Sequence, residues 1–220
     1  MADEMTLFID GQVVQVRGVS PSVTLLEFLR ASARTATKEG CAEGDCGACT
    51  VAVRGEDGAY RAVNSCLVPL GAVSNQEVVT AAGLARDGEL HPVQAALAAA
   101  GGSQCGFCTP GFVMSLFAAQ GSGERGDAVL EGNLCRCTGY RPIREALQNL
   151  PAPDPSDVAT SKASPPTAYS AGDEHFFNPR TLAETLELLA AHPDARFIAG
   201  GTDVGVELNK LIERPPVMVS

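Results

Sequence analysis

Short apolar runs separated by turn signals fill the first eighty residues and predict a small sheet with one helix. Thr6–Ile9 and Gln12–Val16 flank Asp10-Gly11, a dipeptide typical of a tight β-hairpin. After Pro21-Ser22, apolar residues recur at helical spacing, which predicts a helix that starts there. Further strands are expected at 50–53, 61–63 and 77–80, on either side of or after a Gly/Cys-rich loop at 40–49. A sheet with one helix indicates an α+β region.

The next seventy residues follow a helical pattern. Pro92, Pro110 and Pro142 each precede a helix-compatible run, and proline is tolerated at a first helical position because that N–H has no partner within the helix. A short helix is also expected over 127–131, with Gly132 as its stop. Four short antiparallel helices would form a small bundle.

The pattern changes again after residue 150. Five prolines in 151–173, with Ser, Thr and Ala between them, predict an extended linker. An amphipathic helix is expected over 181–191, then a strand over 196–199, and 204–220 is helix-like until Pro215-Pro216. The expected units are therefore residues 1–80, 81–150, the linker 151–173, and 174–220.

Composition narrows the classes of function. The chain has 220 residues and a formal charge of −10, which argues against nucleic-acid or anionic-membrane partners. No apolar run approaches the roughly 20 residues of a membrane span, and the acidic N-terminus lacks the pattern of a secretory signal. Eight cysteines without an export signal indicate metal ligation or redox chemistry in a reducing compartment, so a cytoplasmic location is expected.

The first four cysteines have the spacing of a plant-type ferredoxin loop. Cys41, Cys46 and Cys49 share one loop, and Cys66 follows after sixteen residues. Glycines in this loop allow a sharp turn that brings backbone N–H groups close to sulfur. The alternative is a zinc site with four cysteine ligands, but zinc ligands usually come as two close pairs. A [2Fe–2S] cluster is the favoured interpretation.

The second four cysteines form two close pairs, Cys105 with Cys108 and Cys135 with Cys137. Both pairs precede predicted helix starts, where the partial positive charge of a helix N-terminus favours thiolate. The spacing alone favours a second iron–sulfur cluster only slightly over zinc.

Three cysteine-containing segments together, Glu39–Val51, Gly102–Gly111 and Gly132–Tyr140, resemble the iron–sulfur part of the xanthine oxidase family of molybdenum hydroxylases. The resemblance covers about residues 5–150. It implies a β-grasp ferredoxin-like domain followed by a four-helix domain with a second [2Fe–2S] cluster. It also implies that Gln104 contacts the pterin of a molybdenum cofactor held by a partner subunit, a role that suits a side-chain amide.

The end of the chain is similar to the start of the FAD-binding domain of the same family. The resemblance implies that a Gly-rich turn holds the flavin pyrophosphate and that the flavin site is incomplete in this chain. The FAD-binding residues it implies are Phe197, Ile198, Ala199, Gly200, Gly201, Thr202, Asp203 and Val204. The expected fold class is thus α+β throughout, ending in part of an α+β flavin domain.

The resemblance implies an electron-transfer role rather than a catalytic one. Electrons from xanthine or hypoxanthine would pass from molybdenum–molybdopterin on a large partner subunit, through two [2Fe–2S] clusters, to FAD and NAD+. The chain would act within a hetero-oligomer, as the iron–sulfur/FAD subunit, and would be inactive alone. Two rival hypotheses stay open: the same relay serving an aldehyde, a nicotinate-like heterocycle or carbon monoxide, and a zinc-stabilised interaction module.

Overall fold

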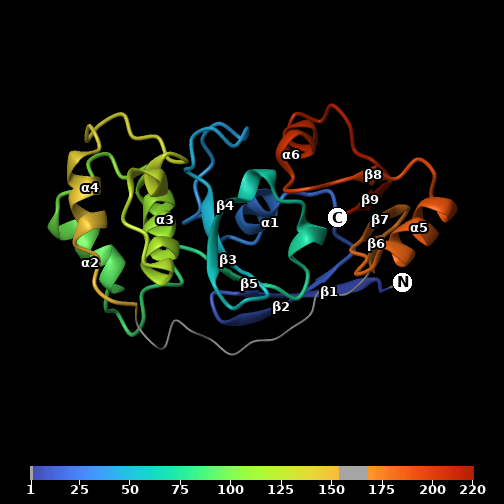
Figure 1. The fold of residues 1–220 in the computed structure, drawn as a ribbon, viewed down its shortest axis with the longest axis horizontal. Coiled ribbons are helices and arrows are strands. Elements are labelled where there is room, and N and C mark those ends of the chain that lie inside the picture. The colour runs from blue at the N-terminus through green and yellow to red at the C-terminus, as the bar shows by residue number, and fades with distance from the viewer. Residues whose placement is uncertain (1, 154–167) are drawn as a thin grey trace.

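A computed structural model describes residues 2–153 and 168–220 of the chain. Three units follow one another along its longest axis, and Figure 1 shows a helical unit at one end, a sheet in the middle, and a second sheet with helices at the other. No helix among the described residues is long and apolar enough to cross a membrane.

The central unit is built on a five-stranded sheet. Its strands are β1 (Glu4–Ile9), β2 (Gln12–Arg17), β3 (Thr50–Arg54), β4 (Tyr60–Asn64) and β5 (Glu77–Val79). Their order is β2-β1-β5-β3-β4, in which β1 and β5 are parallel and the other pairs antiparallel. The five strands predicted from the sequence are thereby confirmed, with the Asp10-Gly11 turn in the left-handed conformation that a tight hairpin needs.

The helix of this unit starts later than the sequence suggested. α1 spans Leu25–Ala31 rather than starting at Pro21-Ser22. Thr24 sets the start, because its hydroxyl accepts the Glu27 N–H while the Glu27 carboxylate accepts the Thr24 N–H, a reciprocal capping box. Two 3₁₀ turns follow β4, η1 at Ser65–Leu67 and η2 at Leu70–Val73.

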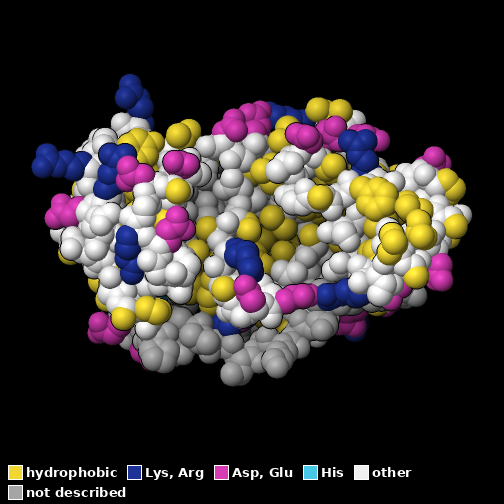
Figure 2. All heavy atoms as spheres, viewed as in Figure 1, with side chains coloured by type: hydrophobic (Ala, Val, Ile, Leu, Met, Phe, Trp, Pro, Cys, Tyr) yellow, Lys and Arg dark blue, Asp and Glu magenta, His cyan; other side chains and the backbone are white. Residues whose placement is uncertain are grey.

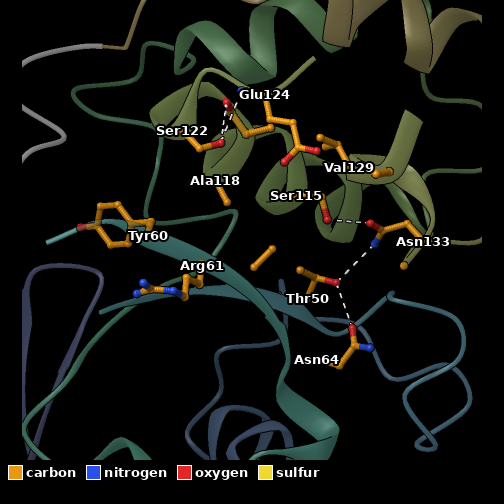
Figure 3. A pocket seen from close by; sticks show the side chains of 14 residues that line it. Thr50, Tyr60, Arg61, Asn64, Ser115, Ala118, Ser122, Glu124, Val129 and Asn133 are labelled. Atoms are coloured by element: carbon orange, nitrogen blue, oxygen red, sulfur yellow. Dashed lines mark hydrogen bonds between the residues drawn. The ribbon is translucent and has the colours of Figure 1, made fainter. Parts of the chain in front are cut away.

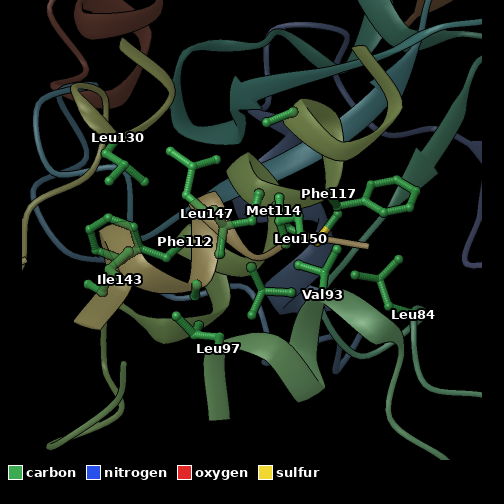
Figure 4. Packing of buried hydrophobic residues seen from close by; sticks show 14 of the residues in the cluster. Leu84, Val93, Leu97, Phe112, Met114, Phe117, Leu130, Ile143, Leu147 and Leu150 are labelled. Carbon is green, nitrogen blue, oxygen red and sulfur yellow. The ribbon is translucent and has the colours of Figure 1, made fainter. Parts of the chain in front are cut away.

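Helices make up the second unit, and three of them begin close to the expected prolines. They are α2 (Pro92–Ala99), α3 (Thr109–Ser122) and α4 (Arg141–Gln148). The fourth expected helix is a 3₁₀ turn, η3 (Asp127–Leu130), which ends before Gly132, so the helix expected over 127–131 was wrong in type. Figure 4 shows its apolar core, where Phe112, Met114 and Leu147 are almost completely buried.

The last unit holds a four-stranded sheet in the order β6-β7-β9-β8. Its elements are β6 (Ala168–Ala171), β7 (Glu174–Phe177), α5 (Leu182–Ala191), β8 (Arg196–Phe197), α6 (Thr202–Asn209) and β9 (Val217–Val219). The predicted helix after Thr181 is confirmed. The strand expected over 196–199 is shorter, and the helix-like stretch 204–220 is helical only to Asn209 before it continues to β9.

The linker expected over 151–173 extends too far at its C-terminal end. Residues 154–167 lie outside the described residues, but β6 lies within the expected linker and pairs with β7. The reason is packing: Tyr169 is 1% exposed and belongs to the core cluster of the central unit, and its hydroxyl donates to the Val19 carbonyl at 2.7 Å. Composition alone does not show such a long-range contact.

Candidate metal centres

The structure brings the first four cysteines together as two thiol pairs. The loop after Gly40 supplies Cys41, Cys46 and Cys49, and η1 supplies Cys66. The Cys41 thiol interacts with that of Cys46, and the Cys49 thiol with that of Cys66. Cys49 and Cys66 are buried, whereas Cys41 and Cys46 are partly exposed.

Backbone N–H groups point at the sulfurs of the more exposed pair, Cys41 and Cys46. The Cys41 Sγ accepts from the N–H groups of Glu43 and Cys46, each at 3.4 Å, and the Cys46 Sγ accepts from the Cys41 N–H at 3.4 Å. Burial opposes ionisation of Cys41, but these donors outweigh it, so its pKa lies below the ordinary thiol value. Burial and the neighbouring Cys41 raise the pKa of Cys46. Such donors stabilise thiolate and, with it, a thiolate-bound metal.

The buried pair, Cys49 and Cys66, has unequal thiol pKa values. The hydrogen bond from the Cys66 side chain lowers the pKa of Cys49 to about 7, while the same contact and burial raise the pKa of Cys66. Ser65 fixes the pair, since its hydroxyl donates to the Cys49 carbonyl at 2.7 Å. Gly40 lies beside the other pair, Cys41 and Cys46, and a Cβ there would meet the Cys46 sulfur.

The second set of cysteines also forms two thiol pairs. Cys105 interacts with Cys137, and Cys108 with Cys135. Cys108 immediately precedes α3, as expected from the sequence for the segment that carries Cys105 and Cys108. Cys105 and Cys137 are exposed, while Cys108 is partly exposed and Cys135 is buried.

Local hydrogen bonds shape this second set as well. The N–H of Phe107 lowers the pKa of Cys105, and burial with the contact to Cys135 raises the pKa of Cys108 to about 12. Cys135 is held by two neighbours: its sulfur lies 3.1 Å from the Thr138 hydroxyl, and its N–H donates to the Tyr140 hydroxyl at 2.9 Å. The Tyr140 side chain therefore orients a ligand loop as well as packing on Phe112.

Two thiol pairs per set fit a [2Fe–2S] cluster better than zinc. A structural zinc ion gathers four ligands around one point. In a [2Fe–2S] cluster, by contrast, four thiolates are divided over two irons. Both sets fit that donor arrangement.

The two sets are joined by one backbone hydrogen bond. The N–H of Leu134, next to Cys135, donates to the carbonyl of Cys46 at 2.9 Å. A cysteine of the first set and the neighbour of a cysteine of the second set are thus in direct contact.

The predicted flavin residues lie next to the first set. Gly200 and Gly201 both have positive φ and lead into α6. Gly201 packs on Leu67, where a Cβ would meet the Leu67 carbonyl, and the Asn209 amide of α6 donates to the Cys66 carbonyl. Of the eight predicted residues, Ile198, Gly201 and Val204 are buried and the others are exposed.

The residue predicted to contact molybdopterin lies at the opposite end of the cysteine arrangement. Gln104 is exposed and immediately precedes the exposed Cys105. Two apolar residues close in sequence to cysteines of the second set are also exposed: Phe107, two residues after Cys105, at 50%, and Leu134, next to Cys135, at 55%.

Several residues that shape the sites were not found from the sequence. They are Ser65, Asn133, Thr138 and Asn209. Three of these four lie within two residues of a cysteine, so proximity to ligands was the available signal. Asn209 offered no such signal, because it reaches Cys66 only through the packing of α6 on η1.

Three protein families match successive parts of the chain. Residues 7–71 match the 2Fe-2S iron-sulfur cluster binding domain, and residues 80–148 match the [2Fe-2S] binding domain. Residues 169–220 match the FAD binding domain in molybdopterin dehydrogenase. The chain thus carries two [2Fe–2S]-binding domains and part of a flavin-binding domain.

Curated relatives cover nearly all of the chain. Xanthine dehydrogenase of Emericella nidulans is 33% identical over 94% of the chain, and xanthine dehydrogenase/oxidase of Rattus norvegicus is likewise 33% identical over 94%. The chain spans about a fifth of the length of these relatives, 20% in both cases.

Solved structures of related enzymes have the same fold. A chain of quinoline 2-oxidoreductase from Pseudomonas putida matches with a TM-score of 0.57 and 30% identity, over 66% of this chain and 90% of that one. Aldehyde oxidoreductase from Desulfovibrio desulfuricans matches with a TM-score of 0.59 and 34% identity, over 68% of this chain and 17% of that one. Together with the paired thiols, these matches show that the chain belongs to the xanthine oxidase family of molybdenum hydroxylases, as an iron–sulfur and flavin-binding region.

Proposed function

We propose that this chain relays electrons from a molybdopterin-binding partner subunit, through clusters on its two cysteine sets, to FAD and NAD+. When bound, two [2Fe–2S] clusters and a flavin would supply the one-electron steps, and the protein would position them and tune their potentials. The cysteines of each set are the proposed ligands. The observation that carries this proposal is the order of the sites along the molecule.

That order starts at the surface. Cys105 and Cys137 of the second set are exposed, and so are the nearby apolar residues Phe107 and Leu134. An exposed apolar surface suits contact with a partner that holds the molybdenum cofactor. Gln104 is the proposed pterin contact, because its amide can donate and accept hydrogen bonds at this surface.

The order ends at the last unit. Cys46 accepts the hydrogen bond from Leu134, and Cys66 receives the hydrogen bond from Asn209 on α6. We place the flavin beside α6 and its Gly200-Gly201 turn, where glycine permits close approach of a pyrophosphate to the backbone. Figure 2 shows hydrophobic side chains gathered over this unit. Its exposed apolar residues include Leu182 and Leu186, which are 74% and 56% exposed. We propose that further parts of a flavin domain cover them.

Xanthine or hypoxanthine is the proposed substrate of the complete enzyme. The support is that relatives matching 94% of the chain are named xanthine dehydrogenases. An aldehyde is the second candidate, because aldehyde oxidoreductases are among the structural neighbours. A hetero-oligomeric enzyme in the cytoplasm fits thiolate ligation, which needs a reducing compartment.

Metal analysis and spectroscopy test the relay. The anaerobically purified protein should contain about four irons and four acid-labile sulfides per chain, because each [2Fe–2S] cluster holds two of each. Stoichiometric zinc in place of iron would contradict the proposal and favour an interaction module. Cys46→Ser and Cys135→Ser serve as controls for each other: each should abolish one cluster signal in EPR and leave the other.

Substrate turnover tests the finer part of the proposal. The complete enzyme, with its partner subunit, should reduce NAD+ with xanthine and hypoxanthine. Turnover of aldehydes or of nicotinate-like heterocycles without turnover of purines would refute the purine assignment and leave the relay intact. Transfer of electrons to oxygen without reduction of NAD+ would refute the proposed acceptor.

A further inference from the structure

A buried amide lies at the contact between the two cluster-binding domains, where Asn133 and Leu134 meet Cys46 and Gly47; we call this contact the seam. Asn133 is 3% exposed and sits two residues before Cys135. Its Nδ2 donates to the Gly47 carbonyl at 2.9 Å and lies 3.3 Å from the Thr50 hydroxyl, while its Oδ1 accepts from the Ser115 hydroxyl at 2.6 Å. Figure 3 shows these side chains pointing toward one another across the boundary between β3 and α3.

The network holds two backbone carbonyls of the first cysteine loop, those of Gly47 and Gly44. The Thr50 hydroxyl donates to the Gly47 carbonyl at 2.7 Å and also contacts the Asn64 side chain at 3.2 Å. Asn64 in turn donates to the Gly44 carbonyl at 2.6 Å. The carbonyls of two glycines in the loop that carries Cys41, Cys46 and Cys49 are therefore held by side chains connected to Asn133.

Glycine makes this contact possible. A Cβ on Gly47 would meet the Gly132 carbonyl and the Asn133 amide, and a Cβ on Gly111 would meet the Gly47 carbonyl. The backbones of the two domains therefore touch without intervening side chains, which places the Leu134 N–H on the Cys46 carbonyl.

Hydrophobic packing alone does not require such a seam. Burying an amide costs free energy unless its donors and acceptor are satisfied, and a satisfied buried network favours one arrangement over others. Both ends of this network lie next to cysteine ligands, since Gly47 follows Cys46 directly. The network therefore acts on the segments that determine where each set of thiols lies.

We propose that Asn133 is a positioning residue that fixes the separation and orientation of the two clusters relative to each other. This inference rests on the proposed function, in that both thiol sets hold [2Fe–2S] clusters. Asn133 does not ligate metal; it acts through the Gly47 carbonyl on the first loop and through the chain leading to Cys135 on the second.

Two variants and a control test the inference in the cluster-loaded protein. Asn133→Leu keeps the branched shape of the side chain, with larger terminal groups, and removes every side-chain hydrogen bond, whereas Ser115→Ala removes only the donor that orients the amide. Ser122→Ala is the matched control, because Ser122 is an exposed serine on the same helix whose hydroxyl bonds to the Ala119 carbonyl and the Glu124 N–H and not to Asn133 or its partners. If Asn133→Leu does not fold, Ser115→Ala decides the test by itself.

The first readout is magnetic coupling between the two reduced clusters, measured by EPR. We expect a coupling splitting in the fully reduced wild-type protein that is lost or smaller in Asn133→Leu, while the g-values of each cluster stay the same. Ser115→Ala should change the splitting in the same direction, and Ser122→Ala should leave it unchanged. Unchanged splitting in a folded Asn133→Leu or Ser115→Ala protein with both clusters would overturn the inference.

The second readout is hydrogen exchange at the Leu134 amide, which does not depend on enzyme activity. Loss of the buried hydrogen bonds beside it should speed its exchange by about tenfold in Asn133→Leu, and less in Ser115→Ala. Exchange at the wild-type rate in both variants would overturn the inference. If the wild-type protein contains fewer than two clusters, the proposed function fails, and exchange at Leu134 still decides whether Asn133 holds the seam.

Discussion

The substitution Glu77→Gln removes one charge from a buried ion pair between β5 and β3. Arg54 Nε lies 2.7 Å from Glu77 Oε2, and the two side chains are only 3% and 16% exposed. The Tyr60 hydroxyl bridges the pair, since it accepts from Arg54 at 2.7 Å and donates to Glu77 at 2.8 Å. The Arg54 guanidinium also lies over the Tyr60 ring, 4.3 Å from its centroid.

The size of the effect follows from this burial. Removing one partner of a buried ion pair typically costs about 3–5 kcal/mol, because the other charge stays buried without compensation. Glutamine keeps an acceptor oxygen, and Arg54 also donates to the Gly58 carbonyl at 3.2 Å. We therefore expect Glu77→Gln to lower the free energy of unfolding by about 3 kcal/mol, at the low end of that range.

The chain offers a matched surface control. Arg61 and Asp57 also form an ion pair at 2.7 Å, but their side chains are 57% and 55% exposed. Asp57→Asn should change the free energy of unfolding far less than Glu77→Gln does, because solvent screens such pairs. Urea unfolding followed by circular dichroism compares the two variants under the same conditions.

A double replacement separates charge burial from packing. Arg54→Met with Glu77→Leu removes both charges and places an apolar side chain at each position, but it also takes two hydrogen-bond partners from the Tyr60 hydroxyl. Its stability should therefore fall less than that of Glu77→Gln, which leaves a buried charge unpaired. The reasoning would be refuted if Glu77→Gln cost no more than Asp57→Asn, since the buried pair would then be as well screened as the exposed one.

Three further substitutions test other parts of the structure. Burial raises the pKa of Tyr60 to about 12 from 10.0. Its neutral hydroxyl therefore contributes stability that is complete below about pH 10 and is lost as the pH rises toward 12. Tyr60→Phe should reduce this loss of stability at alkaline pH, as measured by urea unfolding. Phe112 is 1% exposed in the helical core, so Phe112→Ala should lower the free energy of unfolding by about 3–5 kcal/mol. A lower midpoint in urea unfolding would show this. Gly201→Ala would force an alanine to φ +72° against the Leu67 carbonyl, and should speed hydrogen exchange in α6 while exchange in β1 stays unchanged.

Local signals in the sequence predicted the elements whose cause is local. The hairpin at Asp10-Gly11 needs only a turn dipeptide between two apolar runs, and it forms as expected. The helices after Pro92 and Pro110 also begin where proline allows them. The start of α1 was missed because the decisive signal was a reciprocal pair, Thr24 with Glu27, rather than the proline before it.

Elements whose cause is distant in the sequence could not be predicted in this way. β6 lies in a proline-rich stretch, yet Tyr169 anchors it in the core of a domain that begins far earlier in the chain. β9 follows two prolines and forms because it pairs with β7 and β8. The division of the cysteines into two sets followed from their spacing, whereas the thiol pairs within each set, such as Cys49 of the loop with Cys66 of η1, required the folded chain.

The polar character of the seam has a physical reason that follows from these distances. Two domains joined through a layer of apolar side chains keep their backbones well apart, as packed sheets do at about 10 Å. Here Gly47 and Gly111 remove that layer, and the backbones approach to a direct hydrogen bond of 2.9 Å between Leu134 and Cys46. Backbone groups brought so close are buried and must be paired, so Asn133 and its neighbours supply the partners. A short connection between the two thiol sets therefore requires both glycine and a satisfied amide at the seam.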